Sequence, residues 1–321
     1  NAMSLFWLDL ETGAVKKIAQ EYYYGPFRGR TTSTVWSPDS KWIAYTLNTK
    51  ASIQQVHVYA LEKDKSFAVT DGLSEAAEPA FDKSGKYLYF FGSTDAGPVK
   101  NWFAQSNADM RMTNSIYLAV LRKDLPSPLA KESDEEKPAE KADESKKEEA
   151  KPADKKDEEK GGKKPEDAFR IDFDGLGHRI LALPVPGGYY WNLQAGDEGQ
   201  VYYLETKTVE GGAPVEEQGL AGALHRYDLK ERKDDVVLPL AEWYQLTADK
   251  KKIAYMHQRS ISIVPAAGKP EPGKGRLNIE GIQVRVDPAA EWKQIFDEVW
   301  RINRDYFYDP GMHGADWPAM R

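Results

Sequence analysis

Histidines come first among residues that could do chemistry, because a neutral imidazole can act as a general base or ligate a metal ion. The chain holds five of them, and their spacing matches no metal-ligand pattern. A histidine in a strand or a turn is usually structural. We therefore predict no catalytic or metal-binding role for any of the five: His57, His178, His225, His257 and His313.

Asp172 and Asp174 are the next candidates, since carboxylates two residues apart lie on one face of an extended segment. Gly175 follows them, so the group resembles half of a calcium loop. The other acidic positions of such a loop are missing, and the pattern favours turn capping over cation binding. We predict no metal and no cofactor here.

Activated nucleophiles are also missing from the sequence. Cysteine is absent, and no Gly-x-Ser-x-Gly segment occurs that would expose a serine at a strand-to-helix turn. The segment Gly161 to Asp167 (GGKKPED) lacks the glycine five places before its Gly-Lys pair, so it does not form a phosphate loop. The prediction is a chain with no catalytic, cofactor-binding or metal-binding residues.

Composition argues against two classes of partner. The net charge is −7, and the basic residues are interleaved with acids, so no basic face is available for a nucleic acid. No run of about 18 apolar residues exists that could cross a membrane. The 321 residues suffice for two domains or for one large repeat domain.

One segment, Lys131 to Asp167, differs from the rest in composition. It holds 11 lysines and 15 acidic residues, and no aromatic or branched aliphatic residue. Such a segment cannot bury apolar surface to offset the backbone entropy of ordering, about 1–2 kcal/mol per residue. We predict a disordered, charged insert within a surface connection.

Four other segments of the chain share one pattern. Each begins with a hydrophobic or small residue, continues through a polar turn, and ends in a run of aromatic and β-branched residues, which predicts a β-hairpin. The segments are Trp36 to Tyr45 (WSPDSKWIAY), Phe81 to Phe90 (FDKSGKYLYF), Ala195 to Leu204 (AGDEGQVYYL) and Leu246 to Tyr255 (LTADKKKIAY).

Further strands follow each hairpin. Second strand pairs are predicted at Gln55 to Thr70, Ser115 to Leu129 and Ala223 to Leu238, and the last unit continues through Arg259 to Gly268. Units of four strands that repeat every roughly 40–50 residues are typical of β-propeller blades. A β-sandwich or a solenoid is the alternative, although sandwiches lack such a repeated turn.

The number of units indicates an incomplete ring. Leu5 to Ile18 has the form of the second half of a blade, and about four units follow it. The predicted fold class is all-β: a partial β-propeller of four-stranded blades with a C-terminal amphipathic helix. We expect earlier blades to be missing, and we expect the open blade edges to favour self-association.

The apolar period changes from 2 to 3.6 near Pro288. Apolar side chains recur three and four residues apart from Trp292 to Phe307, which predicts an amphipathic helix of about five turns. Asp287 is the expected N-cap and Pro288 the first helical residue. The aromatic face of this helix needs a partner surface, so it is a second candidate for self-association.

Two stretches carry a family resemblance. Asp172 to Leu193 (DFDGLGHRILALPVPGGYYWNL) and Val286 to Trp317 (VDPAAEWKQIFDEVWRINRDYFYDPGMHGADW) resemble the junction between the second propeller and the first core domain of tricorn-type serine peptidases. The resemblance implies that the blades are about four of a seven-bladed ring. It also implies a parent that trims oligopeptides with a serine nucleophile.

In that family the propeller is expected to gate and scaffold, with peptide substrates passing through it. The family's catalytic residues lie beyond the position of Arg321, so we expect this chain to be inactive. Two alternatives stay open: a non-enzymatic propeller that binds a protein partner, and the propeller cap of a prolyl-oligopeptidase-type hydrolase.

The expected organisation has four parts. Residues 1–3 are a tag remnant, 4–281 the propeller blades, 131–167 the insert and 282–321 the start of the peptidase core domain. The resemblance favours a cytoplasmic location, and a periplasmic one stays open because we expect the native N-terminus to be missing. Peptide specificity and oligomeric state stay open too.

Overall fold

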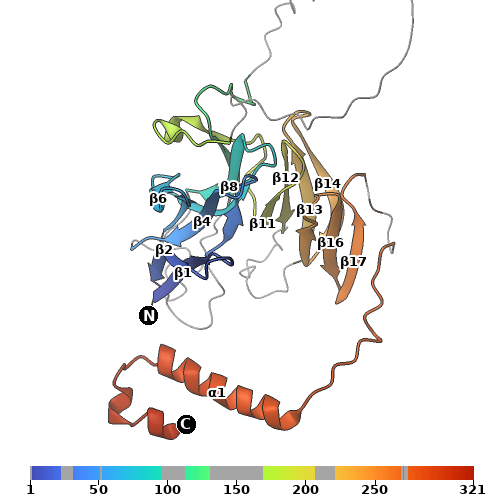
Figure 1. The fold of residues 1–321 in the computed structure, drawn as a ribbon. Coiled ribbons are helices and arrows are strands. Elements are labelled where there is room, and N and C mark those ends of the chain that lie inside the picture. Colours follow the sequence, from blue (N-terminus) through green and yellow to red (C-terminus); the bar gives the residue numbers. More distant parts are fainter. Residues whose placement is uncertain are drawn as a thin grey trace, which may run out of the picture.

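The computed structural model describes residues 2–22, 32–50, 53–94, 113–130, 169–206, 221–268, 270 and 274–321. The predicted insert, residues 131–167, lies outside the described residues. The described part is mostly β, with one long helix near the C-terminus (Figure 1).

The described strands form five antiparallel sheets. We name them the half-blade (β1–β2), blade 1 (β3–β6), blade 2 (β7–β10), blade 3 (β11–β14) and blade 4 (β15–β17). The bounds are Ala2–Leu8 (β1), Val15–Tyr22 (β2), Thr34–Trp36 (β3), Trp42–Asn48 (β4), Gln54–Ala60 (β5), Lys65–Ala68 (β6), Glu75–Phe81 (β7), Tyr87–Ser93 (β8), Ser115–Val120 (β9), Ile180–Ala182 (β10), Tyr190–Ala195 (β11), Gln200–Glu205 (β12), Gly222–Asp228 (β13), Lys233–Ala241 (β14), Trp243–Leu246 (β15), Lys252–His257 (β16) and Ser260–Pro265 (β17).

Each interface between neighbouring sheets has its own hydrophobic core, which is the arrangement of propeller blades. Fully burying a large apolar side chain contributes about 1.5–3 kcal/mol, so these interfaces hold the blades together. Examples across successive interfaces are Trp7 with Tyr59, Val58 with Leu88, Tyr89 with Tyr203, and Leu224 with Ile253. The predicted partial propeller of about four blades with a C-terminal helix is confirmed.

The repeated turn lies between the first two strands of every blade, and we call it the AB turn. Each of the four AB turns contains one residue with left-handed backbone: Ser40 (φ 59°), Gly85 (φ 74°), Gly199 (φ 74°) and Lys250 (φ 63°). The hairpin of blade 3 is one residue shorter, since Ala195 pairs with Val201 whereas Phe81 pairs with Leu88. All four predicted hairpins are therefore present.

One predicted strand pair is wrong. Of the stretch from Ser115 to Leu129, only β9 is a strand, and its outer partner is β10, which follows the predicted insert. The polar and proline-containing run after Val120 forms turns, and a short apolar run beyond the insert completes blade 2. The stretch from Asp172 to Leu193 consequently lies inside blades 2 and 3, not at the domain junction.

Blade 4 has three strands, and a short piece of chain covers its outer edge. The N–H of Ile263 donates to the carbonyl of Gly275 over 2.9 Å, and the N–H of Leu277 donates to that of Ile261 over 2.8 Å. Gly275 has φ +77°, and a β carbon there would lie 2.0 Å from the Ile263 carbonyl oxygen. We call residues 275–277 the edge strap.

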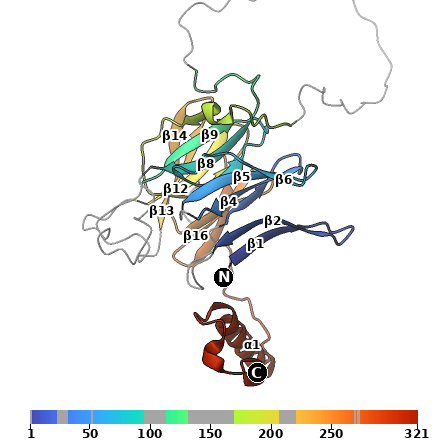
Figure 2. The ribbon, with the colours of Figure 1, turned by 90° about the vertical axis from the view of Figure 1, so that its left-hand side faces the viewer.

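The helix α1 (Pro288–Tyr306) begins as predicted, since the Asp287 carboxylate accepts the N–H groups of Ala289 and Ala290 and Pro288 is the first helical residue. Both views show α1 apart from the sheets at the end of an extended segment (Figures 1 and 2). No helix among the described residues is long and apolar enough to span a membrane.

Candidate functional site

The first strands of blades 2 and 3 carry the same irregularity. The pairing of β7 with β8 shifts between Ala77 and Ala80, and that of β11 with β12 shifts between Trp191 and Gln194. Within these bulges Glu78 and Asn192 have φ of 53° and 56°. Bulges re-aim side chains, and positive φ at a non-glycine residue is strained. Both polar side chains are therefore candidate functional groups.

Each bulge residue bonds to the next blade. Oε2 of Glu78 accepts the N–H of Leu193 over 2.8 Å, and the Glu78 N–H donates to Oγ1 of Thr46 in blade 1 over 3.3 Å. Nδ2 of Asn192 donates to the carbonyl of Tyr244 over 2.9 Å, and the Tyr244 hydroxyl donates back to the Asn192 carbonyl over 2.6 Å. These bonds fix the spacing of the first strands of blades 2 to 4.

The AB turns of blades 2 and 3 are joined by charge. Lys83 pairs with Asp197 at 2.6 Å, and Lys86 pairs with Glu198 at 2.8 Å. The buried carboxylate of Asp82 also accepts the N–H of Gly199 over 2.8 Å. The exposed ion pairs contribute little each, so the bond to Asp82 holds this junction most firmly.

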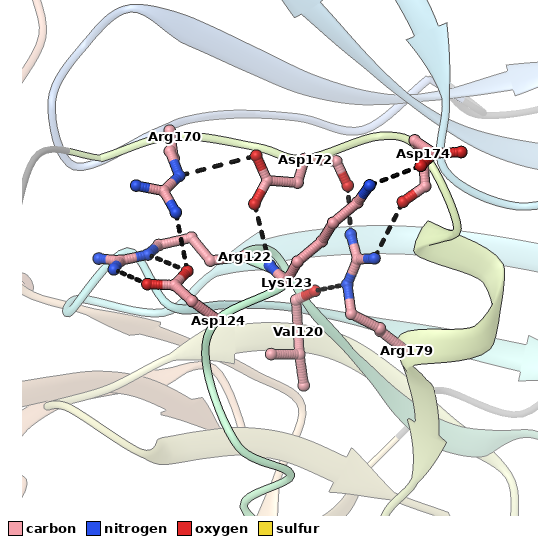
Figure 3. A network of polar contacts seen from close by, with 8 residues as sticks. All are labelled: Val120, Arg122, Lys123, Asp124, Arg170, Asp172, Asp174 and Arg179. Carbon is pink, nitrogen blue, oxygen red and sulfur yellow. Dashed lines mark hydrogen bonds and ion pairs between the residues drawn. The ribbon is translucent and has the colours of Figure 1, made fainter.

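A polar network closes the base of the predicted insert (Figure 3). The Asp172 carboxylate accepts the N–H of Lys123 over 2.9 Å, and the Asp174 carboxylate pairs with the Lys123 ammonium at 2.5 Å. The hydrogen bond with Lys123 lowers the pKa of Asp174. The two candidate cation ligands therefore face a lysine. Among the described residues, no group of three His, Asp or Glu side chains could hold a metal ion.

Arginines complete the network on either side (Figure 3). The Arg179 guanidinium donates to the carbonyls of Val120 (3.1 Å), Asp174 (3.0 Å) and Asp172. The Asp124 carboxylate accepts from Arg122 over 3.0 Å and from Arg170 over 2.9 Å. The hydrogen bond from Arg122 is the main cause that lowers the pKa of Asp124 to about 2.

The structure does not bring the five histidines together. They lie on β5 (His57), η4 (Leu176–Arg179; His178), β13 (His225), β16 (His257) and η6 (Met312–Gly314; His313). His57 stacks on Tyr45 with ring centroids 5.5 Å apart, and burial lowers the pKa of its imidazole. His313 lies edge-on to Phe307.

His225 is different, because two carboxylates hold its ring. Nδ1 lies 2.7 Å from Oδ2 of Asp234, and Nε2 lies 3.1 Å from Oε2 of Glu205. The ring stacks on Tyr203, whose hydroxyl donates to Asp234 over 2.7 Å. Burial opposes the charge, but the hydrogen bond and charge of Asp234, together with Glu205, outweigh it and raise the pKa of His225.

The sequence analysis named His225 without a catalytic or metal-binding role, and it did not identify its carboxylate partners or the bulge residues Glu78 and Asn192. The one signal for the first bulge is Pro79 directly after Glu78, because proline inside a strand pattern marks a bulge or an edge. No short sequence pattern predicts the cluster of Glu205, His225 and Asp234, because its members come from three strands.

The helix α1 presents an apolar face to solvent and has no buried residue. Beside this face the chain's own end packs on the helix: the Trp300 and Trp317 rings stack 6.1 Å apart, and each indole N–H donates to the other's carbonyl over 2.9 and 3.2 Å. The exposed fractions on the bare face are 68% for Trp292, 54% for Ile295, 50% for Phe296 and 53% for Val299. This face is a candidate docking surface.

The fold and these contacts define a class of protein: a propeller module cross-linked at its first strands and continued by an amphipathic helix. A family model described as "Tricorn protease second beta propeller domain" matches residues 1–267, and one described as "Tricorn protease C1 domain" matches residues 288–321. The chain belongs to the tricorn protease family.

Similar proteins include "Tricorn protease homolog 1" of Streptomyces coelicolor, 28% identical over 98% of this chain and 28% of that protein. "Tricorn protease" of Thermoplasma volcanium is 23% identical over 94% of this chain and 26% of that protein. A solved structure titled "Crystal structure of the tricorn protease" matches with a TM-score of 0.66 and 20% identity, covering 95% of this chain and 27% of the other. The chain thus spans about a quarter of the length of these relatives.

Proposed function

We propose that this chain is the gating and scaffolding propeller of a tricorn-like serine peptidase that trims oligopeptides, and that it has no peptidase activity of its own. The observation that carries the proposal is the pair of family matches, which joins this propeller to the start of a core domain of a protease. The hydrogen bonds between the first strands of neighbouring blades support the gating part, since they hold the polar side chains of Glu78 and Asn192 at a fixed spacing.

The inactivity part is supported by the geometry of His225. Both ring nitrogens face carboxylates, so neither is left to accept a proton from a hydroxyl nucleophile. The expected result is no turnover of short fluorogenic peptides by this chain. Turnover that a serine-directed inhibitor abolishes would contradict this part.

Gating requires that the propeller contacts peptide. We expect labelled neutral oligopeptides to bind this chain weakly, as a rise in fluorescence anisotropy that an excess of unlabelled peptide reverses. Substituting Glu78 by alanine removes the bond to Leu193 and should weaken binding. A chain that binds no oligopeptide at all would refute the gating role.

The scaffolding part assigns the bare face of α1 to the peptidase core of the longer relatives. Its support is the exposed apolar side chains on one face, beside which Trp300 already packs on Trp317. In this chain alone we propose that the same face, or the open edge of β1, associates between copies. Sedimentation at rising concentration tests this, and Trp292→Glu should reduce any association through α1. A chain that stays monomeric would contradict self-association.

A further inference from the structure

Lys250 occupies a costly backbone position. It is the left-handed residue of the AB turn in blade 4, with φ 63°, where blades 2 and 3 place glycine. A long side chain in this conformation is strained, and such strain often accompanies function. Glycine would adopt the same φ without cost, so the turn does not require a lysine.

The ammonium group of Lys250 is also unfavourably placed. The side chain is half-buried, and of the described carboxylates none forms an ion pair with it. Burial, and then the charge of Lys83 on the AB turn of blade 2, lower the pKa of Lys250, and the charge of Asp197 opposes them only in part. A half-buried cation beside a second cation is stabilised by an anion that neutralises it.

The nearby acids are already engaged. The Asp197 carboxylate pairs with Lys83 at 2.6 Å. The Asp249 carboxylate accepts the hydroxyl of Thr247 over 2.6 Å and the N–H of Lys251 over 3.0 Å. The Lys250 ammonium group therefore lies among the AB turns of blades 2 to 4 without an ion pair to either of these carboxylates.

We propose that Lys250 binds a carboxylate of an oligopeptide at the AB turns, and so gives the propeller a preference for acidic peptides. This inference rests on the proposed function of peptide gating. Strain and an unpaired charge coincide at one residue, and both are explained if the residue is kept for a ligand. The ligand chemistry is a carboxylate, supplied by an acidic side chain or by a peptide C-terminus.

The test compares labelled oligopeptides that differ in carboxylates only. One contains glutamates, the second has glutamines in their place, both are amidated at the C-terminus, and a third is the glutamine peptide with a free C-terminus. At low salt we expect the carboxylate peptide that Lys250 recognises to bind about fivefold more tightly than the neutral one, the upper range for an exposed ion pair. Tighter binding of the first peptide than of the second indicates an acidic side chain as the ligand. Tighter binding of the third than of the second indicates the C-terminal carboxylate.

Variants identify the residue responsible. Lys250→Gln and Lys250→Gly should both remove the preference, and the glycine variant also relieves the backbone strain, so it keeps the fold. Lys251→Gln is the matched control, because Lys251 is an exposed neighbour of equal charge; it should keep the preference.

Four results would overturn the inference. Equal binding of all three peptides would refute it while leaving the proposed gating intact. A preference that survives in Lys250→Gln, or that Lys251→Gln loses equally, would show a general effect of charge. Absence of binding by every peptide would refute both this inference and the proposed function.

Discussion

Replacing His225 by glutamine removes a charge that links side chains from three strands of blade 3. His225 is on β13, Glu205 on β12 and Asp234 on β14, and the imidazole bridges the two carboxylates at 3.1 and 2.7 Å. Both nitrogens can donate only when the ring is protonated. The variant therefore leaves two carboxylates close together without their cation.

The magnitude follows from burial. Hydrogen bonds to charged groups contribute about 1.5–3 kcal/mol each. The His225 residue is 8% exposed, but the side chains of Asp234 and Glu205 are 29% and 30% exposed, so water replaces part of the lost interaction. We expect His225→Gln to lower the free energy of unfolding by about 2–3 kcal/mol while the wild-type ring is charged.

The effect should depend on pH in a defined direction. The folded-state pKa of His225 is raised above its unfolded value. The cluster's contribution is therefore complete below about pH 6.5 and is lost as pH rises through the folded-state pKa. Urea unfolding followed by circular dichroism, at about pH 6 and about pH 9, should show a penalty for His225→Gln that shrinks at the higher pH.

His57→Gln is the matched control. Burial lowers the pKa of His57, so its native state binds protons less readily than the unfolded chain, and its contribution is lost as pH falls. The two variants should therefore change with pH in opposite directions. A penalty for His225→Gln that is the same at both pH values, or larger at the higher one, would refute the charged-ring assignment.

Three other predictions concern the edge strap, the base of the insert and the C-terminal tryptophans. Gly275→Ala should detach the strap and speed amide exchange at Ile263, because the new β carbon meets the Ile263 carbonyl oxygen at 2.0 Å. Gly268→Ala, also at positive φ but with nothing within 4 Å, should cost only about 1 kcal/mol, and equal exchange in the two variants would contradict the clash. Arg179→Met should destabilise the protein by about 1–3 kcal/mol and expose the base of the insert to proteases, since three carbonyls lose their donor. Lys123→Met, which removes an exposed ion pair, should cost less than about 1 kcal/mol; equal penalties in chemical denaturation would argue against this ranking. Trp317→Ala should abolish the near-ultraviolet circular dichroism of the stacked pair and keep the α1 signal in the far ultraviolet. An unchanged near-ultraviolet spectrum would contradict the stacking of Trp300 on Trp317.

The repeat and the helix could be predicted because their determinants are local. The AB turn needs one residue able to adopt positive φ between two strand-forming runs, and such a turn occurs in the windows around Ser40, Gly85, Gly199 and Lys250. Asp287 and Pro288 likewise define the start of α1 through groups within three residues. The failed prediction, the outer strand of blade 2, concerned a pairing that crosses the whole insert.

The sequence alone thus determined the blade pattern, the helix start and the family, since each depends on residue type at short spacing. The tertiary structure decided which strand completes blade 2, which carboxylates hold His225, and that Lys250 is half-buried without an ion pair to a described carboxylate. These outcomes depend on distances between residues far apart in the chain, and a charge acquires its partner and its pKa only when the blades pack. No local pattern encodes them, because the same histidine or lysine is ordinary on an exposed strand and unusual between packed blades.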